Sequence, residues 1–316
     1  MSAYIDAHLG RFGVEPICRV LGIAPSSYYA RRRRPPSARA LADAELVGEI
    51  HAARSGYRRV YGIRKTWREL SRRGVHAGRD RVGRLMRAEG LQGVRRGRRH
   101  RTTTPDERAA DRARDLVERR FVAEAPNRLW VADITYIRTY AGFSYLAFIL
   151  DVFSRRVVGW QIATHMRAQL VLDALEMAVA LRELDGRLVA HSDRGSQYTS
   201  LRYTDRLDEL GIDPSVGSRG DAYDNAMAEA FVATFKAELV AGRRFTGFEA
   251  AEHEALRWIS FYNRERLHEQ LGDVPPAEFE ERFRETHNGS YRAVEPDRPA
   301  LAEAAPVGLG ARVSAT

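Results

Sequence analysis

The chain has 316 residues, of which 44% are hydrophobic, and this composition excludes wholesale disorder and allows a sizeable core. No apolar run approaches the ~18 residues that a membrane span requires, so we expect a cytoplasmic protein without a membrane partner. Residues 1–10 lack the basic-then-apolar pattern of a secretory signal. The single cysteine, Cys18, excludes an intramolecular disulfide and a thiolate-rich zinc site.

The net charge of +9 is distributed unevenly along the chain. Residues 1–123 hold 29 Arg and Lys against 13 Asp and Glu, whereas residues 124–316 hold 22 against 29. Arginine is abundant throughout, with 49 of the 51 cations, but abundance does not explain why the excess lies at one end. The asymmetry predicts a nucleic-acid-binding region joined to a mildly acidic remainder.

Residues 1–40 are predicted to form an N-terminal helical segment with a basic linker. The apolar residues near Ile17 favour a short helix, and Ala24-Pro25 marks a turn. The four arginines at 31–34 then form a basic exit, that is, a charged segment that leads out of the turn, and Pro35-Pro36 signals a linker.

Residues 41–100 show the apolar spacing of three short helices, expected over 41–50, 63–70 and 80–89. The last two, separated by a glycine-containing turn, predict a helix-turn-helix-like DNA-binding domain. Any small three-helix bundle gives the same spacing, and this alternative remains open from the sequence. The expected DNA contacts at the start of the third helix and in the run after it are Arg79, Arg81, Arg95, Arg96, Arg98 and Arg99.

Residues 101–123 form a basic linker that is expected to follow DNA phosphates, to act as a solvated hinge, or to do both. After this linker the composition of the sequence changes. Residues 124–285 predict strands over 129–137, 143–151, 156–163, 188–191 and 212–216, with helices over 168–184, 200–210, 222–240 and 249–262. This order is that of a ribonuclease-H-like α/β core, a mixed five-stranded sheet with helices, preceded here by a small all-α domain. Residues 286–316 read as a C-terminal tail.

Two aspartates lie in or just after predicted strands, where a carboxylate is unusual unless something stabilises its charge. Asp133 lies inside an apolar strand and shares its face with Val131 and Thr135, so it requires a charge partner, solvent or a metal. Asp193 directly follows the fourth strand, where α/β sheets place ligands. Taken alone, Asp193 is more simply a turn residue that caps the next segment.

A glutamate and a lysine share one face of the predicted helix 222–240. Lys236 follows Glu229 by seven residues, which is two helical turns. A solvated pair on an exposed face is the simple alternative, but lysine occurs in this chain only at 65 and 236, which favours a specific role. Asn225, four residues before Glu229, either lines the same site or caps the helix.

The three carboxylates are more informative together than apart. A first-strand Asp, a fourth-strand Asp and a late-helix Glu converge in this fold, and 35 residues lie between Asp193 and Glu229. Two Mg²⁺ ions need several hard carboxylate oxygens and serve phosphoryl displacement at a water or a 3′-OH. We therefore predict Asp133, Asp193 and Glu229 as metal ligands and catalytic residues, with Lys236 and Asn225 contacting substrate DNA.

Short motifs around these residues together span about residues 57 to 280. They include Trp130-Val131-Ala132-Asp133-Ile134-Thr135-Tyr136, His191-Ser192-Asp193-Arg194-Gly195-Ser196-Gln197-Tyr198, Gly220-Asp221-Ala222-Tyr223-Asp224-Asn225-Ala226 and Tyr262-Asn263-Arg264-Glu265-Arg266-Leu267-His268. In them the chain resembles second-frame (OrfB) transposases of the insertion-sequence-three family, relatives of retroviral integrases in the DD(35)E class. Residues 57–60 depart slightly, reading Tyr-Arg-Arg-Val where Gly-Val-Tyr-Gly is commoner.

The resemblance implies a DDE-type polynucleotidyl transferase that uses two Mg²⁺ or Mn²⁺ ions for strand cleavage and strand transfer at insertion-sequence ends. It implies terminal inverted repeats and target DNA as substrates, a homo-oligomer on DNA, and an upstream-frame helix-turn-helix partner protein. A catalytically inactive DNA-binding regulator and a ribonuclease-H-type hydrolase are the competing interpretations. The intact carboxylates argue against the first, and the basic N-terminal third has no role in the second.

Three further residues are expected to be structural or remain open. Asp151 is expected to pair with the neighbouring Arg155 and Arg156 rather than bind a metal. His191 either orients the aspartate that follows it or is a satisfied strand-end residue. His268 is expected to be solvated rather than to contact DNA.

Overall fold

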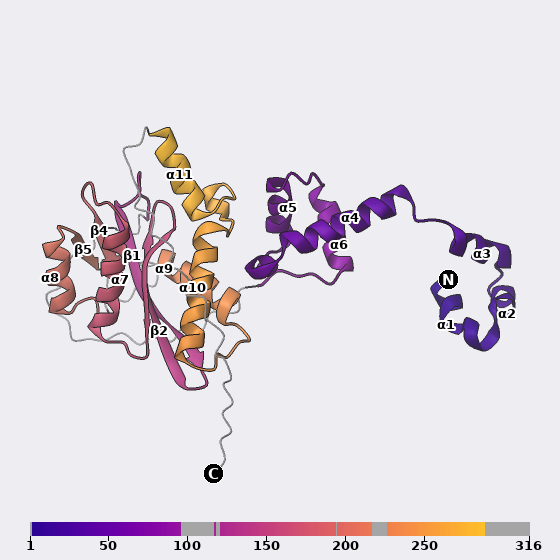
Figure 1. The fold of residues 1–316 in the computed structure, drawn as a ribbon, viewed down its shortest axis with the longest axis horizontal. Helices are drawn as coiled ribbons and strands as arrows, with labels where there is room; N and C mark the ends of the chain where they lie inside the picture. Colours follow the sequence, from indigo (N-terminus) through magenta and orange to yellow (C-terminus); the bar gives the residue numbers. More distant parts are fainter. Residues whose placement is uncertain (1, 96–116, 118–120, 194, 217–225, 288–316) are drawn as a thin grey trace, which may run out of the picture. The chain divides into compact units, whose positions relative to one another are not determined.

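The computed structural model describes residues 2–95, 117, 121–193, 195–216 and 226–287 (Figure 1). The chain divides into two compact units, residues 1–93 and 94–316, and each is described by itself. Among the described helices, none is long and apolar enough to cross a membrane. Several predicted features lie outside the described residues: Arg96, Arg98, Arg99, Asn225, nearly all of the linker 101–123, and the tail from residue 288.

The first unit opens with three short helices, α1 (Ser2–Phe12), α2 (Val14–Val20) and α3 (Pro25–Arg33). They enclose a small core of Ile5, Ile17, Cys18 and Tyr28. The prediction of a turn and a basic exit over residues 25–33 was wrong, because these residues are helical. Pro25 begins α3 at a position where a helix needs no backbone N–H donor.

The rest of this unit contains α4 (Ala38–Ala53), the 3₁₀ turn η1 (Gly56–Val60), α5 (Ile63–Arg72) and α6 (Arg79–Ala88). The three predicted helices are therefore present. They pack around Leu46, Ile50, Ala53, Leu70, Val82, Leu85 and Met86. The buried Arg54 holds the connections between them, since its guanidinium donates to the carbonyls of Arg59 at 2.7 Å and Gln92 at 2.9 Å.

The second unit is built on one five-stranded sheet. Its strands are β1 (Leu129–Thr139), β2 (Gly142–Asp151), β3 (Val157–Ala163), β4 (Val189–Ser192) and β5 (Asp213–Val216). They lie in the order β3-β2-β1-β4-β5. The first three are antiparallel neighbours, whereas β4 and β5 run parallel to β1. This is the mixed sheet of the ribonuclease-H-like fold, as the sequence predicts.

Helices cover both faces of this sheet (Figure 1). On one face α7 (Ala168–Leu181) packs against apolar side chains of the first three strands, and α8 (Leu201–Glu209) adds to the same core. Gly159 of β3 allows the close approach of α7, because a Cβ atom there would collide with the backbone of Ala174.

The other face is covered by α9 (Ala226–Phe235) and α10 (Phe248–Arg264), which pack through aromatic rings. Phe231 of α9 contacts Phe148 of β2 at 4.4 Å between ring centroids, and it contacts Trp258 of α10 at 5.7 Å. The predicted long helix does extend to Val240, but its geometry changes: α9 ends at Phe235, and a π-helical turn, η2 (Lys236–Val240), continues directly from it.

A buried polar network joins the end of the sheet to α11 (Pro276–Thr286). Glu280 accepts bonds from Arg182 at 2.7 and 2.9 Å and from the Ser154 hydroxyl at 2.6 Å. Asp151 accepts from the backbone amides of Asn127 (2.7 Å) and Ser154 (3.0 Å). Asp151 is thus structural, as predicted, but its nearby arginine is Arg182, 3.9 Å away, rather than the sequence neighbours that we expected.

His268 was predicted to be solvated, and the structure contradicts this. It is 8% exposed and lies edge-to-face on Tyr262, with 4.7 Å between ring centroids. Because the residues around it in the sequence are charged, the sequence does not indicate that His268 is buried where η3 (Glu269–Leu271) begins.

Candidate active site and DNA-binding surface

Asp133 lies in β1, directly opposite Phe148 of β2, and is half-buried. Its carboxylate accepts a hydrogen bond from the Ile134 amide at 2.7 Å. Burial, together with the negative charge of Asp193, raises the pKa of Asp133 to about 7, against the opposing effect of the Lys236 charge. The mid-strand carboxylate thus has a second carboxylate and a lysine as electrostatic neighbours.

Asp193 is placed beside Asp133 by the parallel pairing of β1 with β4. Ala132 and Ser192 are the last registered pair of these strands, and each aspartate is the next residue along its strand. Asp193 as a whole residue is exposed at the end of the strand, but its carboxylate accepts from the Gly195 amide at 2.9 Å and is partly desolvated by surrounding protein, which raises its pKa. The topology therefore brings the two predicted aspartates together.

His191 lies two residues before Asp193 and is buried. Its Nδ1 lies 2.9 Å from the Ser215 hydroxyl of the neighbouring strand, so it is satisfied as a strand-end histidine. Its charge also lowers the pKa of Asp193. Both of the interpretations that the sequence left open are compatible with this position.

Tyr198 belongs to the motif around Asp193, but the sequence predicts no role for it. Its hydroxyl is buried and has no hydrogen-bond partner among the described residues. Burial raises its pKa well above the ordinary value, and the charges of Asp133 and Asp193 raise it further. A buried hydroxyl without a partner, beside two carboxylates, indicates a position where a further polar group belongs.

Glu229 lies on α9, half-buried, on the sheet face that carries Asp133. Because Asp133 and Phe148 are cross-strand neighbours, their side chains share a face, and Phe148 contacts Phe231 of α9. Within the described part of the chain, however, no three His, Cys, Asp or Glu side chains gather closely enough to hold a metal. The structure thus brings Asp133 and Asp193 together and places Glu229 on the adjacent helix, without closing the triad.

Lys236 begins the π-helical turn after α9. Its Nζ lies 3.8 Å from the ring centroid of Tyr136 in β1, a cation–π contact, and its charge lowers the pKa of Asp133. The lysine is therefore an electrostatic neighbour of Asp133, and the helix geometry changes from α to π at this residue.

The oxygen donors of this site suit a hard divalent cation. Asp133 and Asp193 supply carboxylate oxygens side by side, and Glu229 lies on the helix that covers the same face. Magnesium and manganese prefer such oxygen ligands, and a cation would offset the mutual repulsion of the aspartates.

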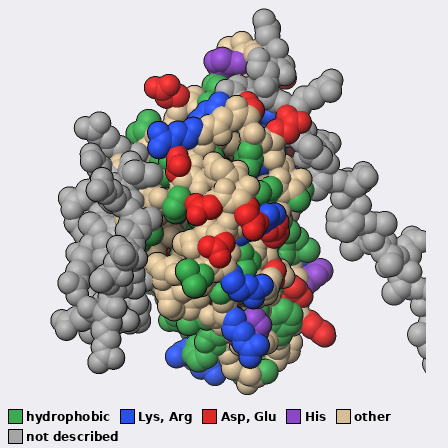
Figure 2. All heavy atoms as spheres, turned by 90° about the vertical axis from the view of Figure 1, so that its left-hand side faces the viewer, with side chains coloured by type: hydrophobic (Ala, Val, Ile, Leu, Met, Phe, Trp, Pro, Cys, Tyr) green, Lys and Arg blue, Asp and Glu red, His purple; other side chains and the backbone are tan. Residues whose placement is uncertain are grey.

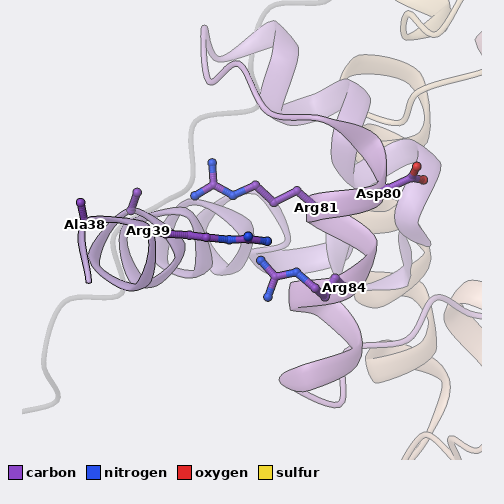
Figure 3. Close-up of a pocket in the computed structure, with 6 residues that line it drawn as sticks. Ala38, Arg39, Asp80, Arg81 and Arg84 are labelled. Carbon is purple, nitrogen blue, oxygen red and sulfur yellow. The ribbon is translucent and has the colours of Figure 1, made fainter. Parts of the chain in front are cut away.

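The second candidate site is a basic cavity of about 690 Å³ between α4 and α6 of the first unit. Arg81 and Arg84 extend into it from α6, and Arg39 extends into it from α4, whereas Asp80 points away (Figure 3). Asp43 holds the first two, accepting from Arg81 at 2.7 Å and from Arg84 at 2.6 Å. The hydrogen bond from Arg84, followed by that from Arg81, lowers the pKa of Asp43.

The other predicted DNA contacts in the described part of this unit are exposed. Arg79 is near Asp80 at 3.7 Å, in a pair in which both side chains are solvated, and Arg95 lies on the surface. In the second unit, the face seen in Figure 2 carries acidic and basic side chains intermixed rather than gathered by sign.

Both units match known protein families. The description "HTH-like domain" belongs to a family that matches residues 39–99, and two families described as "Integrase core domain" match residues 123–222 and 210–276.

Three curated relatives are matched along nearly their whole length. A putative transposase for insertion sequence element IS986/IS6110 from Mycobacterium tuberculosis is 48% identical over 267 residues, covering 82% of this chain and 95% of the relative. The transposase for insertion sequence element IS629 from Shigella sonnei is 46% identical over 288 residues, covering 90% and 96%. Transposase InsF for insertion sequence IS3A from Escherichia coli is 32% identical over 280 residues, covering 88% and 97%.

Proposed function

Because the chain belongs to the IS3 family of insertion-sequence transposases, we propose that its core performs metal-dependent strand cleavage and strand transfer at the ends of an insertion element. Asp133, Asp193 and Glu229 are the catalytic carboxylates. The observation that supports this most is the adjacency of the two aspartates at the ends of paired strands, with a cation and an unpartnered buried hydroxyl beside them.

Asp133, Asp193 and Glu229 would hold the metal ions, two Mg²⁺ or Mn²⁺ per site. When bound, such ions lower the pKa of a nucleophilic water or 3′-OH and stabilise the leaving oxygen of an in-line displacement. Lys236 contributes a point charge that binds a phosphate of the reacting strand. The Tyr198 hydroxyl, which is buried and has no partner among the described residues, would be free to donate a hydrogen bond to a polar group that binds beside the aspartates.

Residues 1–93 bind the DNA on which this chemistry acts. The arginines of α4 and α6 bind phosphates of the terminal inverted repeats or target DNA, and counterion release favours the complex. A homo-oligomer on DNA and an upstream-frame partner protein complete the proposed assembly, in the cytoplasm.

The test uses the full chain and a duplex taken from the DNA that flanks the gene, including any inverted repeat found there. Glu229→Gln removes the charge of a proposed metal ligand and keeps the shape of the side chain. We expect cleavage with Mg²⁺ to fall by about a thousandfold or more while duplex binding persists. Glu249→Gln, at an exposed glutamate on the neighbouring helix α10, is the matched control and should cleave normally.

Cleavage by Glu229→Gln within about tenfold of wild type would remove Glu229 from the proposed triad. If the wild-type chain binds the duplex but never cleaves it with Mg²⁺ or Mn²⁺, the protein is an inactive DNA-binding regulator instead. Preferential cleavage of an RNA–DNA hybrid would assign it to the ribonuclease-H-type hydrolases.

A further inference from the structure

The three helices at the start of the chain lie outside the family match to an HTH-like domain, which begins at residue 39. Within them, α2 ends at Val20 and α3 begins at Pro25, so that the four residues 21–24 join the two helices. Gly22 in this turn has a φ of 67°, a conformation that favours glycine. A glycine-containing turn of this length is the connection found between the two helices of a helix-turn-helix unit.

The core of these helices fixes which face of α3 points inward. Tyr28 is 3% exposed, packs with Ile17 and Cys18 of α2, and donates a hydrogen bond from its hydroxyl to Asp6 of α1 at 2.6 Å. Arg32, one turn further along α3, lies over the Tyr28 ring at 5.9 Å. The inward face of α3 is therefore the one that carries Tyr28 and Arg32.

The opposite face of α3 is polar and exposed. Ser26, Tyr29 and Arg33 are spaced i, i+3 and i+7 and thus share a face, and all three are exposed. A recognition helix contacts base edges through residues near its N-terminus, and serine hydroxyls can bond to those edges. Arginines further along such a helix are suited to phosphate contacts.

The charge around α3 has one sign. Residues 25–40 contain five arginines and no acidic residue. The acidic residues of the preceding helices are Asp6, bonded to Tyr28, and Glu15 in the first turn of α2. Arginines in the last turn also stabilise a helix through its dipole. That effect explains their position, but not the absence of acidic residues or the exposed polar side chains at the start of α3.

We propose that α1, α2 and α3 form a second helix-turn-helix unit, in which the outward face of α3 binds the major groove of duplex DNA. The chain then carries two DNA-reading modules in series, this one and the module of α5 and α6, and contacts two separate blocks of sequence. This inference rests on the proposed function insofar as its ligand is DNA, but it does not depend on the chemistry of the core.

The experiment selects duplexes with the full chain from a library whose interior is randomised, and then measures affinity for the selected duplex against salt. Arg33→Gln/Arg34→Gln removes two charges, one from the outward face of α3 and one directly after the helix. Arg11→Gln/Arg19→Gln removes two exposed charges from α1 and α2 and is the matched control. Ser26→Glu places a negative charge on the outward face of α3 at a helix start, where an acidic residue favours the helix, so it separates binding from folding.

We expect wild type and control to select two separated blocks of conserved base pairs. The α3 variants should lose one block and bind the wild-type duplex about tenfold or more weakly. For the double arginine variant, the slope of log affinity against log salt should fall by about two.

An unchanged selected sequence and an unchanged salt slope in both α3 variants would overturn the inference. So would loss of binding to an upstream-frame protein with DNA binding intact, because α3 would then be a protein-docking face. If the wild-type chain cleaves element-end DNA while the α3 variants select normally, only this inference fails. A wild-type chain that binds no duplex fails the proposed function as well.

Discussion

In residues 1–93 arginine lies mainly on the surface, whereas in the α/β core several arginines are partners of carboxylates. The basic cavity of the first unit has one tethering carboxylate, Asp43, for Arg81 and Arg84. In the core, by contrast, Arg182 binds Glu280 through two nitrogens, with both side chains buried. The comparison teaches that the placement of acidic residues, and not the number of arginines, decides which cations are available to DNA.

The same comparison separates the carboxylates of the core into two classes. Glu280 sits among arginines, and although burial alone would raise its pKa, the charge and hydrogen bonds of Arg182 bring it down to about 2. Burial and the charge of Asp193 instead raise the pKa of Asp133, and desolvation raises the pKa of Asp193, with Lys236 as the cation that acts on Asp133. Among the described residues, Asp133 and Asp193 of the proposed metal site thus differ from Glu280 in forming no ion pair with an arginine.

Breaking the buried pair should have the largest effect on stability. Glu280→Gln leaves the guanidinium of Arg182 buried with only the more distant Asp151 as counter-charge, and we expect a loss of about 3 kcal/mol in the free energy of unfolding of the core. Thermal unfolding followed by the fluorescence of the buried Trp130 and Trp258 measures it. Glu278→Gln, at an exposed ion pair on the same helix, should cost no more than about 1 kcal/mol.

The pH dependence sharpens this prediction. The folded pKa of Glu280 lies below its ordinary 4.5, so its stabilising contribution is present at neutral pH and is lost as the pH falls from 4.5 to about 2. Asp151 has the opposite sign, because burial and then Glu280 raise its pKa to about 6, so that protonating it below that pH favours the fold. The acid loss between 4.5 and 2 should be absent in Glu280→Gln; its persistence there would assign it to another carboxylate.

Lys236 tests whether the cation beside the aspartates serves substrate or structure. Lys236→Ala should weaken productive binding of the reacting strand end about tenfold, and Lys236→Arg should retain part of the activity because charge matters more than geometry. Lys65→Ala removes the other lysine that lies over a tyrosine ring, and it controls for the loss of such a contact. A lowered melting temperature with an unchanged rate per folded molecule would make Lys236 structural.

The smallest expected effect concerns the tether in the basic cavity. Asp43→Asn releases Arg81 and Arg84 from a competing carboxylate, and because surface ion pairs are weak, duplex affinity should rise by no more than about fivefold. Asp80→Asn changes the net charge equally on the same surface without releasing these arginines, so its gain in affinity should be smaller. Equal gains in both variants would mean that Asp43 acts through net charge alone.

Local periodicity was sufficient to predict much of the fold. All five strands and the helices α4 to α8 and α10 were predicted within a few residues, because apolar spacing reports which face is buried. The helical conformation of α3 was missed because its arginines and serines show no apolar period. The change from α to π geometry after Phe235 was also missed, because the helical spacing of apolar residues in the sequence continues through it.

The contacts of individual residues depend on segments that are distant in the sequence, and these are harder to predict. The adjacency of Asp133 and Asp193 followed from the strand order of the fold. The partner of Asp151 did not, because Arg182 is distant in the sequence and reaches it only once α7 has packed on the sheet. Tyr198 and Glu280 acquire their surroundings in the same way, from segments that the sequence does not place beside them.

The central claim is that Asp133, Asp193 and Glu229 act as one unit, and single-turnover cleavage of element-end DNA tests it most directly. The rates of Asp133→Asn, Glu229→Gln and the double variant are compared with wild type at saturating Mg²⁺. Residues that hold one metal site should give losses that do not multiply, so the double variant should be about as slow as the slower single one, each at least about a thousandfold below wild type. Losses that multiply, or a single variant within about tenfold of wild type, would contradict the shared site.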